Sequence, residues 1–314
     1  MTDLEQFAED VRCGLSKHPR ELPSRYLYDE LGSALFEAIC FLPWYSITRA
    51  EFRLLAAHGA EILGRAAPSR IVELGPGSGE KLRTLVADSP PLRAGLDVHV
   101  VDVSRRALDR TTQTLGSLGV ARVTAHQARY EAGLRAAVTG ATGDGRTLVL
   151  LLGSNIGNFD IDHAGALLGR LRRVLARGDH FLLGADLVKP ESVLLRAYDD
   201  PLGVTAAFNR NLLVRINREL GGDFDLAAYD HRALWNARAS RVEMHLVARG
   251  DQVVRVAAAS LTMPMTRGET IWTESSHKYT DAGLSALLEG AGFDTAGAWI
   301  DEREQFALVL ARRN

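Results

Sequence analysis

The sequence predicts an α/β protein in which a doubly wound parallel sheet is interrupted by an inserted domain of mixed α+β structure. Two observations support this. From about Glu51 to Leu187, short apolar runs alternate with helical segments, and after Lys189-Pro190 the pattern changes to strands with one polar face. Apolar strands that alternate with helices are typical of a parallel sheet covered on both faces. A chain of 314 residues is long enough for two domains.

Four apolar runs of the first half are the predicted parallel strands: Arg70–Leu74, Val98–Val101, Leu148–Leu152 and Phe181–Leu183. A helix is predicted over Ala164–Ala176, because its leucines recur on one face and Gly178 follows it.

The second half begins with a helical stretch over Phe208–Leu220. Arg241–Leu246 then alternates polar and apolar residues, as an antiparallel strand with one solvated face does. Gly250-Asp251 predicts a tight hairpin turn into a strand over Val253–Leu261.

The tail predicts a return to the first sheet. Thr280 is a helix-capping residue, the following leucines lie on one helical face, and glycines end the helix before a last apolar strand over Phe306–Leu310. We therefore expect one domain from residues 50–188 and 279–314. The second domain is expected from residues 1–49 and 189–278.

Composition excludes several classes of protein. Hydrophobic residues make up 46% and charged residues 24%, which is the balance of a globular chain rather than a disordered or membrane-embedded one. Lys+Arg 37 against Asp+Glu 39 gives a net charge of −2, so the positive field that binds nucleic acid is missing. No signal peptide, membrane-spanning run or metal-ligand spacing is present, so we expect a cytoplasmic protein without metal, membrane or nucleic-acid partners. We also expect a monomer, although no feature of the sequence specifies the oligomeric state.

A glycine-rich turn follows the first predicted strand. It contains Gly75, Gly77 and Gly79. Missing side chains let a nucleotide-like ligand lie against the backbone where a helix begins. A dinucleotide motif needs a further glycine where Glu80 stands, and Glu73 would repel a pyrophosphate. S-adenosylmethionine, which has cationic groups and no phosphate, fits better; a purely structural turn is the alternative.

Two further polar segments follow predicted strands. Asp102 directly follows Val98–Val101, where a carboxylate can accept both hydrogen bonds of an adenosine ribose; capping of the next helix is the alternative. The segment from Gly153 to Phe159 follows the most apolar strand, where its amides could orient a polar substrate or simply form a loop. Both segments are expected at the carboxyl edge of the sheet, where open α/β sheets bind ligands.

Longer blocks of sequence accompany the glycine turn and Glu80-Lys81. They are Tyr28–Phe36, Leu42-Pro43 with Tyr45, Thr48–Glu51, Gly153-Ser154 with Ile156–Asn158, Arg196–Asp200, Gly203–Asn211, and Thr273-Glu274 with Ser276 and Lys278. With these blocks the chain resembles, over nearly its whole length, the histidine-specific S-adenosylmethionine-dependent methyltransferases of ergothioneine biosynthesis, which make hercynine, the trimethylated betaine of histidine. The resemblance implies a Rossmann-like class I methyltransferase sheet, S-adenosylmethionine as cofactor, L-histidine as substrate, and substrate binding by the inserted domain.

The resemblance also implies roles for individual residues. The residues matching those that hold the substrate's amino and carboxylate groups are Tyr45, Asn158 and Tyr198, with Tyr28 close to the amine. Tyr28 and Asn158 are the expected catalytic residues. Glu274 and Ser276 match the residues that read the imidazole, in a pocket lined by Met244. The expected cofactor-binding residues are Glu73, Gly75, Gly77, Gly79, Lys81, Asp102, Tyr130 and Gly153.

These residues also have structural interpretations, and the chain departs from the family in places. The tyrosines could be core aromatics, Met244 a gap-filler, and Glu274–Ser276 an ordinary strand end. Trp44 replaces a common glutamate, Ser46-Ile47 stand where Tyr-Pro is usual, and Arg129-Tyr130 stand where an Asp-Phe pair commonly meets the adenine. Tyr130 can still stack on the adenine, whereas Ser46 and Arg129 are not counted among the site residues.

In the implied reaction the α-amine of histidine attacks the methyl group of S-adenosylmethionine, and S-adenosylhomocysteine is released. Two alternatives are an enzyme of the same fold that acts on another amine, such as a tryptophan derivative, and a non-catalytic S-adenosylmethionine-binding protein. Glu274 argues against an indole, which offers one donor and no acceptor. The substrate-binding residues argue against a binding protein, and Glu80 makes a dinucleotide oxidoreductase the weakest alternative.

Overall fold

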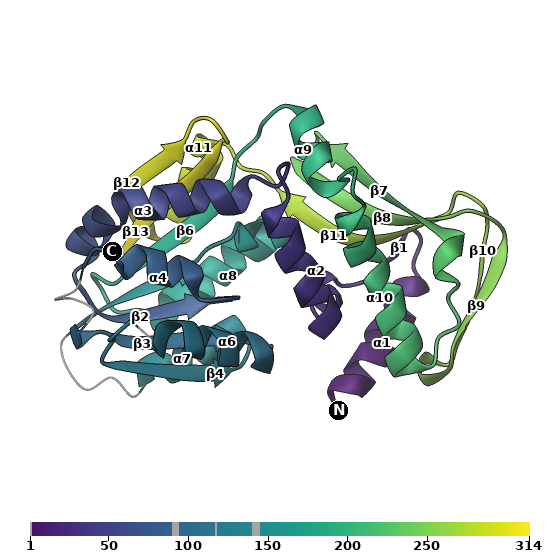
Figure 1. Cartoon of the computed structure of the whole chain (residues 1–314), viewed down its shortest axis with the longest axis horizontal. Helices are drawn as coiled ribbons and strands as arrows, with labels where there is room; N and C mark the ends of the chain where they lie inside the picture. The colour runs from purple at the N-terminus through teal and green to yellow at the C-terminus, as the bar shows by residue number, and fades with distance from the viewer. Residues whose placement is uncertain (1, 90–93, 117, 140–144) are drawn as a thin grey trace. The chain divides into compact units, whose positions relative to one another are not determined.

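The chain divides into two compact units in the computed structural model, which describes residues 2–89, 94–116, 118–139 and 145–314 (Figure 1). Unit 1 comprises Met1–Ser46 and Lys189–Ser276, and unit 2 comprises Ile47–Val188 and His277–Asn314. Each unit is thus assembled from two separate stretches of sequence. The domain boundaries expected from the sequence lie within three residues of these limits.

Unit 2 is built on a seven-stranded sheet with the order β12-β13-β6-β5-β2-β3-β4. Its strands are β2 (Pro68–Leu74), β3 (Asp97–Asp102), β4 (Arg122–Gln127), β5 (Arg146–Leu151), β6 (His180–Asp186), β12 (Phe293–Asp301) and β13 (Phe306–Arg313). The strands from β6 to β4 run parallel, and β13 pairs antiparallel with both β6 and β12. The predicted sheet and the predicted return of the tail to it are confirmed.

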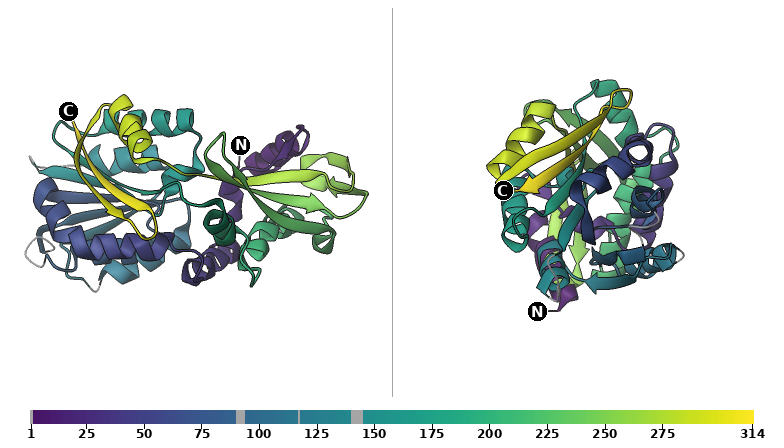
Figure 2. Two further views of the ribbon diagram at one scale, coloured as in Figure 1. Left: turned by 90° about the horizontal axis from the view of Figure 1, so that it is seen from above. Right: turned by 90° about the vertical axis from the view of Figure 1, so that its left-hand side faces the viewer.

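Helices cover both faces of this sheet, so the doubly wound arrangement is also confirmed. One layer contains α3 (Ile47–Ala66), α4 (Glu80–Val86) and α6 (Arg105–Gly116); the other contains α7 (Tyr130–Thr139), α8 (Ile161–Val174) and α11 (Asp281–Gly290). Figure 2 shows α3 and α11 on opposite sides of the strands. The second layer buries leucines of α7, α8 and α11 against apolar side chains of the strands. As predicted, Thr280 caps α11 by accepting the N–H of Gly283 at 3.0 Å.

Unit 1 contains a four-stranded sheet with the order β1-β11-β8-β7 and a separate two-stranded sheet, β10-β9. The strands are β1 (Arg20–Glu21), β7 (Tyr229–Asn236), β8 (Arg241–Ala248), β9 (Gln252–Val256), β10 (Leu261–Met265) and β11 (Thr270–His277). The helices are α1 (Asp3–Leu15), α2 (Glu30–Phe41), α9 (Glu191–Tyr198) and α10 (Val204–Leu220). Because α10 packs against α2, β7 and β8, it joins the helical and sheet parts of the unit.

Short 3₁₀ helices complete the description: η1 (Ser24–Leu27), η2 (Asn155–Asn158), η3 (Leu226–Ala228) and η4 (Ala257–Ala259). No helix in the described ranges has the length and apolar character needed to span a membrane.

The hairpin expected at Gly250-Asp251 is wrong. β8 ends before this turn and pairs with β7, whereas β9 pairs with β10, with Val254 opposite Met263. The strand expected to run to Leu261 is interrupted by η4, and Ser260 then adopts a left-handed φ of 49°. A local turn signal marks where the chain bends, but the partner of a strand is decided by the packing of the whole unit.

Candidate active site

The glycine turn of unit 2 adopts a backbone conformation that favours glycine. The φ angles are 71° at Gly75, 59° at Gly77 and 78° at Gly79. A Cβ added to Gly75 would lie 2.8 Å from Oη of Tyr130, and one added to Gly79 would lie 2.9 Å from Cγ2 of Thr111. Side chains are therefore excluded at Gly75 and Gly79 by both dihedral angle and space.

Two carboxyl groups and a phenol that the sequence singled out lie together beside this turn. Glu73 on β2 is buried, and its Oε2 has no hydrogen-bond partner among the described residues. Burial raises the pKa of Glu73 to about 8 against the opposing effect of Lys81, and the Glu51 and Asp102 charges add to the rise. Burial also raises the pKa of Asp102, and burial with the Asp102 charge raises the pKa of Tyr130. This corner of unit 2 would favour a cation.

Asp102 ends β3 as predicted, but it does not cap α6. Its carboxylate accepts the N–H of Ser104 at 2.8 Å, and Ser104 itself caps the helix through a 3.3 Å bond from the N–H of Ala107 to its Oγ. Ser104, and not Asp102, is therefore the residue that caps α6.

Glu51, which the sequence reasoning did not assign to the site, connects two of the expected cofactor residues. This fully buried side chain of α3 accepts the N–H of Gly153 at 2.8 and 2.9 Å and pairs with Nζ of Lys81 at 2.6 Å. A Cβ at Gly184 on β6 would lie 2.0 Å from Glu51 Oε1, so glycine there makes room for the carboxylate. The sequence signal that could have identified Glu51 is a single acidic residue at an otherwise apolar position of a helix.

The polar segment after β5 also has an unusual backbone. Gly153 has a φ of 75° and Ser154 a φ of 57°, and Oγ of Ser154 accepts the N–H of Asp186 at 3.0 Å. Asn158 ends η2 with an exposed side chain. Asn158 belongs to unit 2, whereas the other expected substrate-binding residues belong to unit 1.

In unit 1 the expected substrate-binding residues form two hydrogen-bonded pairs. Oη of Tyr28 donates to Oε1 of Glu274 at 3.4 Å, and Oη of Tyr198 donates to Oγ of Ser276 at 2.7 Å. The rings of Tyr45 and Tyr198 meet edge to face with 6.2 Å between their centroids. Tyr28 and Tyr198, which are distant in the sequence, thus both contact residues of β11.

Met244 lies on β8, the strand next to β11. Its side chain is buried, and its carbonyl accepts a hydrogen bond from Oγ1 of Thr273 at 3.0 Å. A buried position on β8 is consistent with both the pocket role and the gap-filling role. Of the residues that depart from the family, Trp44 stacks with the Arg196 guanidinium 5.3 Å from the ring centroid, and Ser46 and Ile47 are buried.

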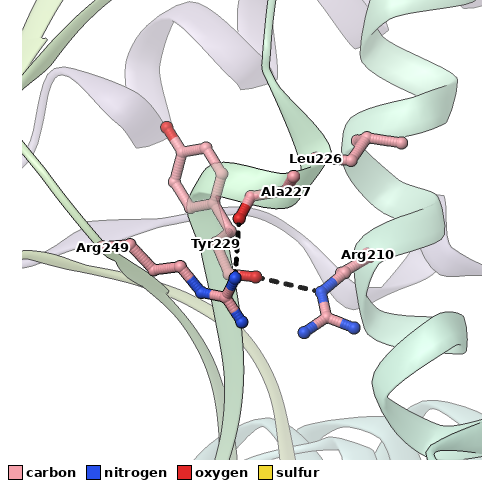
Figure 3. A pocket seen from close by; sticks show the side chains of 5 residues that line it. All are labelled: Arg210, Leu226, Ala227, Tyr229 and Arg249. Carbon is pink, nitrogen blue, oxygen red and sulfur yellow. Dashed lines mark hydrogen bonds between the residues drawn. The ribbon is translucent and has the colours of Figure 1, made fainter.

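Unit 1 also contains a cavity of about 320 Å³ that these pairs do not line. Figure 3 shows its lining residues, which are Arg210, Leu226, Ala227, Tyr229 and Arg249. Both arginines donate to backbone carbonyls there, Arg210 to Tyr229 at 3.0 Å and Arg249 to Ala227 at 3.1 Å. None of the expected site residues lines this cavity. Within the described ranges, no group of three His, Cys, Asp or Glu side chains could hold a metal ion.

Comparison with known proteins identifies the family. The family described as histidine-specific methyltransferase, SAM-dependent, matches residues 7–313. The chain belongs to this family. The methyltransferase is 42% identical over 306 residues to a histidine N-alpha-methyltransferase of Mycobacterium tuberculosis (strain CDC 1551 / Oshkosh), which covers 97% of this chain and 94% of that protein. It is 40% identical over 320 residues to the protein of the same name from Mycolicibacterium smegmatis, covering 98% and 95%.

A more distant relative is named for a different substrate. The methyltransferase is 27% identical over 331 residues to an L-tryptophan methyltransferase of Psilocybe serbica, covering 96% of this chain and 91% of that protein. The expectations of family, enzyme class and S-adenosylmethionine as cofactor are confirmed by the family match.

Proposed function

We propose that the methyltransferase methylates the α-amine of L-histidine and forms hercynine by three successive transfers. The observation that carries this proposal is the arrangement on β11, where Glu274 pairs with Tyr28 and Ser276 pairs with Tyr198. Residues two apart on a strand face the same side, so a carboxylate and a hydroxyl are offered together. The histidine N-alpha-methyltransferases at 40% and 42% identity support the same substrate.

A carboxylate beside a hydroxyl suits an imidazole ring. The Glu274 carboxylate can accept the imidazole N–H. Because Ser276 Oγ accepts the Tyr198 proton, the Ser276 hydroxyl can direct its own hydrogen toward the other ring nitrogen. A side chain that leaves either group unpaired costs about 1–3 kcal/mol of binding free energy, which gives selectivity against other amino acids.

The amine of the substrate must release a proton to solvent before each of the three transfers, because only a neutral amine can attack. When bound, S-adenosylmethionine supplies a methyl group on a sulfonium; transfer forms the N–C bond as the S–C bond breaks, and the thioether is left uncharged. We assign Tyr28 of unit 1 to the amine, and the resemblance to the family is what adds Asn158 as a second catalytic residue. Since the Tyr28 hydroxyl donates to Glu274, its oxygen lone pairs can accept an amine N–H.

The residues of unit 2 fit a cationic adenosyl ligand. Glu73 Oε2 is a buried acceptor without a described partner, and Gly75, Gly77 and Gly79 have no side chains to cover the backbone at their positions. We assign Asp102 to the ribose hydroxyls, Tyr130 to the adenine and Glu73 to the cationic groups. Lys81 and Gly153 would act through Glu51, which holds them both.

The test of the proposed function is a competition among substrates. The purified protein is incubated with S-adenosylmethionine and an equimolar mixture of the common amino acids, and methylated products are identified by mass spectrometry. We expect trimethylated histidine alone. Methylation of tryptophan or another amine would replace the proposed substrate. Absence of any product from a protein that still binds the cofactor would contradict the proposed reaction.

Two variants test the assignment of the residues. Glu274→Ala should weaken histidine binding about tenfold or more and leave S-adenosylmethionine binding unchanged, because a buried imidazole donor loses its acceptor. Asp102→Ala should do the reverse. Calorimetric titration of both ligands into each variant measures the two dissociation constants, and equal losses for both ligands would contradict the assignment.

A further inference from the structure

A buried histidine of unit 1 lies directly behind the Tyr198 backbone. His231 on β7 exposes 2% of its side chain. Its Nε2 lies 2.8 Å from the carbonyl oxygen of Tyr198, and its Nδ1 lies 2.9 Å from Nδ2 of Asn209 on α10. Both ring nitrogens therefore have a partner.

The partners determine which nitrogen of His231 carries the proton. Nδ2 of Asn209 also donates to the carbonyl of His245 at 3.2 Å, and this bond fixes the amide orientation because Oδ1 cannot donate. Nδ2 is a donor only, so Nδ1 of His231 must accept. The ring proton is then on Nε2, which donates to the Tyr198 carbonyl. The neutral Nε2–H tautomer is the only state that satisfies all these bonds.

The charges around His231 are mixed. Burial lowers the pKa of His231. The hydrogen bond to the Tyr198 carbonyl and the Asp199 and Asp200 carboxylates oppose this effect, and the Arg210 guanidinium adds to it. The nearer carboxylate, Oδ1 of Asp199, is 4.0 Å from Nε2 and largely exposed, so water screens it. A second proton on the ring would also face the Asn209 amide hydrogens. The neutral form is therefore favoured at neutral pH.

These bonds form a continuous chain from α10 to the substrate-binding strand. Asn209 holds His231, His231 holds the Tyr198 carbonyl at the end of α9, and the Tyr198 hydroxyl holds Ser276 on β11. Helix ends leave carbonyls without partners in the helix, so the imidazole also ties down the last residue of α9.

We propose that His231 is a positioning residue for substrate selectivity: it fixes the end of α9 so that the Tyr198 hydroxyl keeps Ser276 oriented toward the imidazole of the substrate. The inference rests on the proposed function, because it assigns Ser276 to the imidazole. His231 itself contacts no reacting atom. Its replacement should therefore change the affinity for histidine and leave the affinity for the cofactor unchanged.

The first test compares dissociation constants. His231→Leu removes both hydrogen bonds and should weaken histidine binding about tenfold, with S-adenosylmethionine binding unchanged within about twofold. His231→Gln keeps a donor near the Nε2 position and should restore histidine binding to within about threefold of the wild type. His180→Leu, which removes a buried histidine of unit 2, is the matched control and should leave histidine binding unchanged.

A pH profile separates positioning from a general loss of packing. Protonation of His231 breaks the hydrogen bond from Asn209. The affinity of the wild type for histidine should therefore decrease as the pH falls below the lowered pKa of His231, and His231→Gln should not show this decrease. The ratio of the two dissociation constants cancels the titration of the substrate's own imidazole. A ratio that does not change with pH would overturn the inference.

The tautomer gives a measurement that needs no substrate. Nitrogen-15 NMR of the ring, assigned by comparison with His231→Gln, should show a neutral ring protonated at Nε2 at pH 7. A ring protonated at Nδ1, or at both nitrogens, would overturn the inference whatever the substrate. If the wild type binds histidine and His231→Leu binds it equally well, the inference fails and the proposed function stands. If the wild type does not bind histidine, the proposed function fails, and with it the role assigned to His231.

Discussion

Single carboxyl groups in unit 2 are buried at a cost that a cationic ligand would relieve. Glu73 has one oxygen without a described partner, and burial raises its pKa to about 8. In the unfolded chain the pKa of the same group would lie near the ordinary glutamate value of 4.5. Because the folded state holds the proton more tightly, Glu73 makes unfolding easier as the pH rises from 4.5 to about 8.

Replacing Glu73 by glutamine should therefore stabilise the ligand-free protein, and only at the higher pH. We expect the free energy of unfolding of Glu73→Gln to match the wild type near pH 4.5 and to exceed it by a few kcal/mol near pH 8.5. Urea unfolding at both pH values measures this. Glu80→Gln, at a partly exposed position on α4, is the control. If the free energies of unfolding of the variant and the wild type differ by the same amount at both pH values, the pKa of Glu73 is not raised in the folded protein.

For individual residues, little of the candidate site could be predicted from the local sequence. The roles of the turn glycines and of Asp102 could be predicted, because strand ends and glycine spacing are local signals. The contacts of β11 could not be, since Tyr28 and Glu274 are 246 residues apart; their roles came from the resemblance. His231 and Asn209 carry no local signal, because a histidine on an alternating strand looks like any half-buried residue.

Single elements are held in place by side chains outside them. Helix α10 begins at Val204 after Gly203, which offers no side-chain cap. The buried Asp200 instead accepts the N–H groups of Leu202 at 3.0 Å, Val204 at 3.2 Å and Thr205 at 2.7 Å. Burial by itself would raise the pKa of Asp200, but these backbone hydrogen bonds lower it below its usual value.

Asp200→Asn should destabilise the protein by about 1–3 kcal/mol at pH 7, because an amide group would face a backbone N–H. A carboxyl with a lowered folded-state pKa stabilises the protein above its ordinary pKa of about 3.9 and loses this effect only as the pH falls below that value. The difference between variant and wild type should thus be constant from pH 5 to 8, in urea unfolding. A difference that changes across this window would contradict the capping role of Asp200.

The elements that the sequence predicted well are the buried ones. β6 is buried at every residue and β5 at all but its first, so both appear as apolar runs. β4 at the edge of the sheet alternates exposed and partly buried residues and was not predicted, nor was β12 at the other edge. Edge strands have one face or side open to water, which removes the apolar signal. The incorrect hairpin has a different cause: the turn signal at Gly250-Asp251 is local, whereas the pairing of β9 with β10 depends on the packing of the whole unit.

At the scale of the whole molecule, the change of pattern along the chain was the useful signal. The two segments of each unit differ in character from the neighbouring segments, so the interrupted order could be predicted without knowing how either unit folds. The exact limits, Ser46 and Ser276, lie where no composition change occurs, and only tertiary packing defines them.

The assignment of the cofactor to unit 2 has a consequence for the dynamics of the whole chain. S-adenosylmethionine at a hundred times its dissociation constant should add about 2.7 kcal/mol to the stability of the unit that binds it. Hydrogen exchange should then slow in the glycine turn and at the carboxyl ends of β2 and β3, and not in the interior of β7 and β8. Asp102→Ala at the same ligand concentration is the control. Slower exchange in β7 and β8 with none in unit 2 would contradict the assignment.

The pairing of β13 with β6 has a consequence for synthesis on the ribosome. β6 is buried at every residue in the folded protein, yet one of its two partner strands, Phe306–Arg313, follows more than a hundred residues later. Until that strand leaves the exit tunnel, the nascent chain carries an apolar strand with one edge unpaired, and such edges recruit other chains. Because of the order of the elements, we expect slow translation across residues 187–305 to lengthen the time for which this edge of β6 stays open.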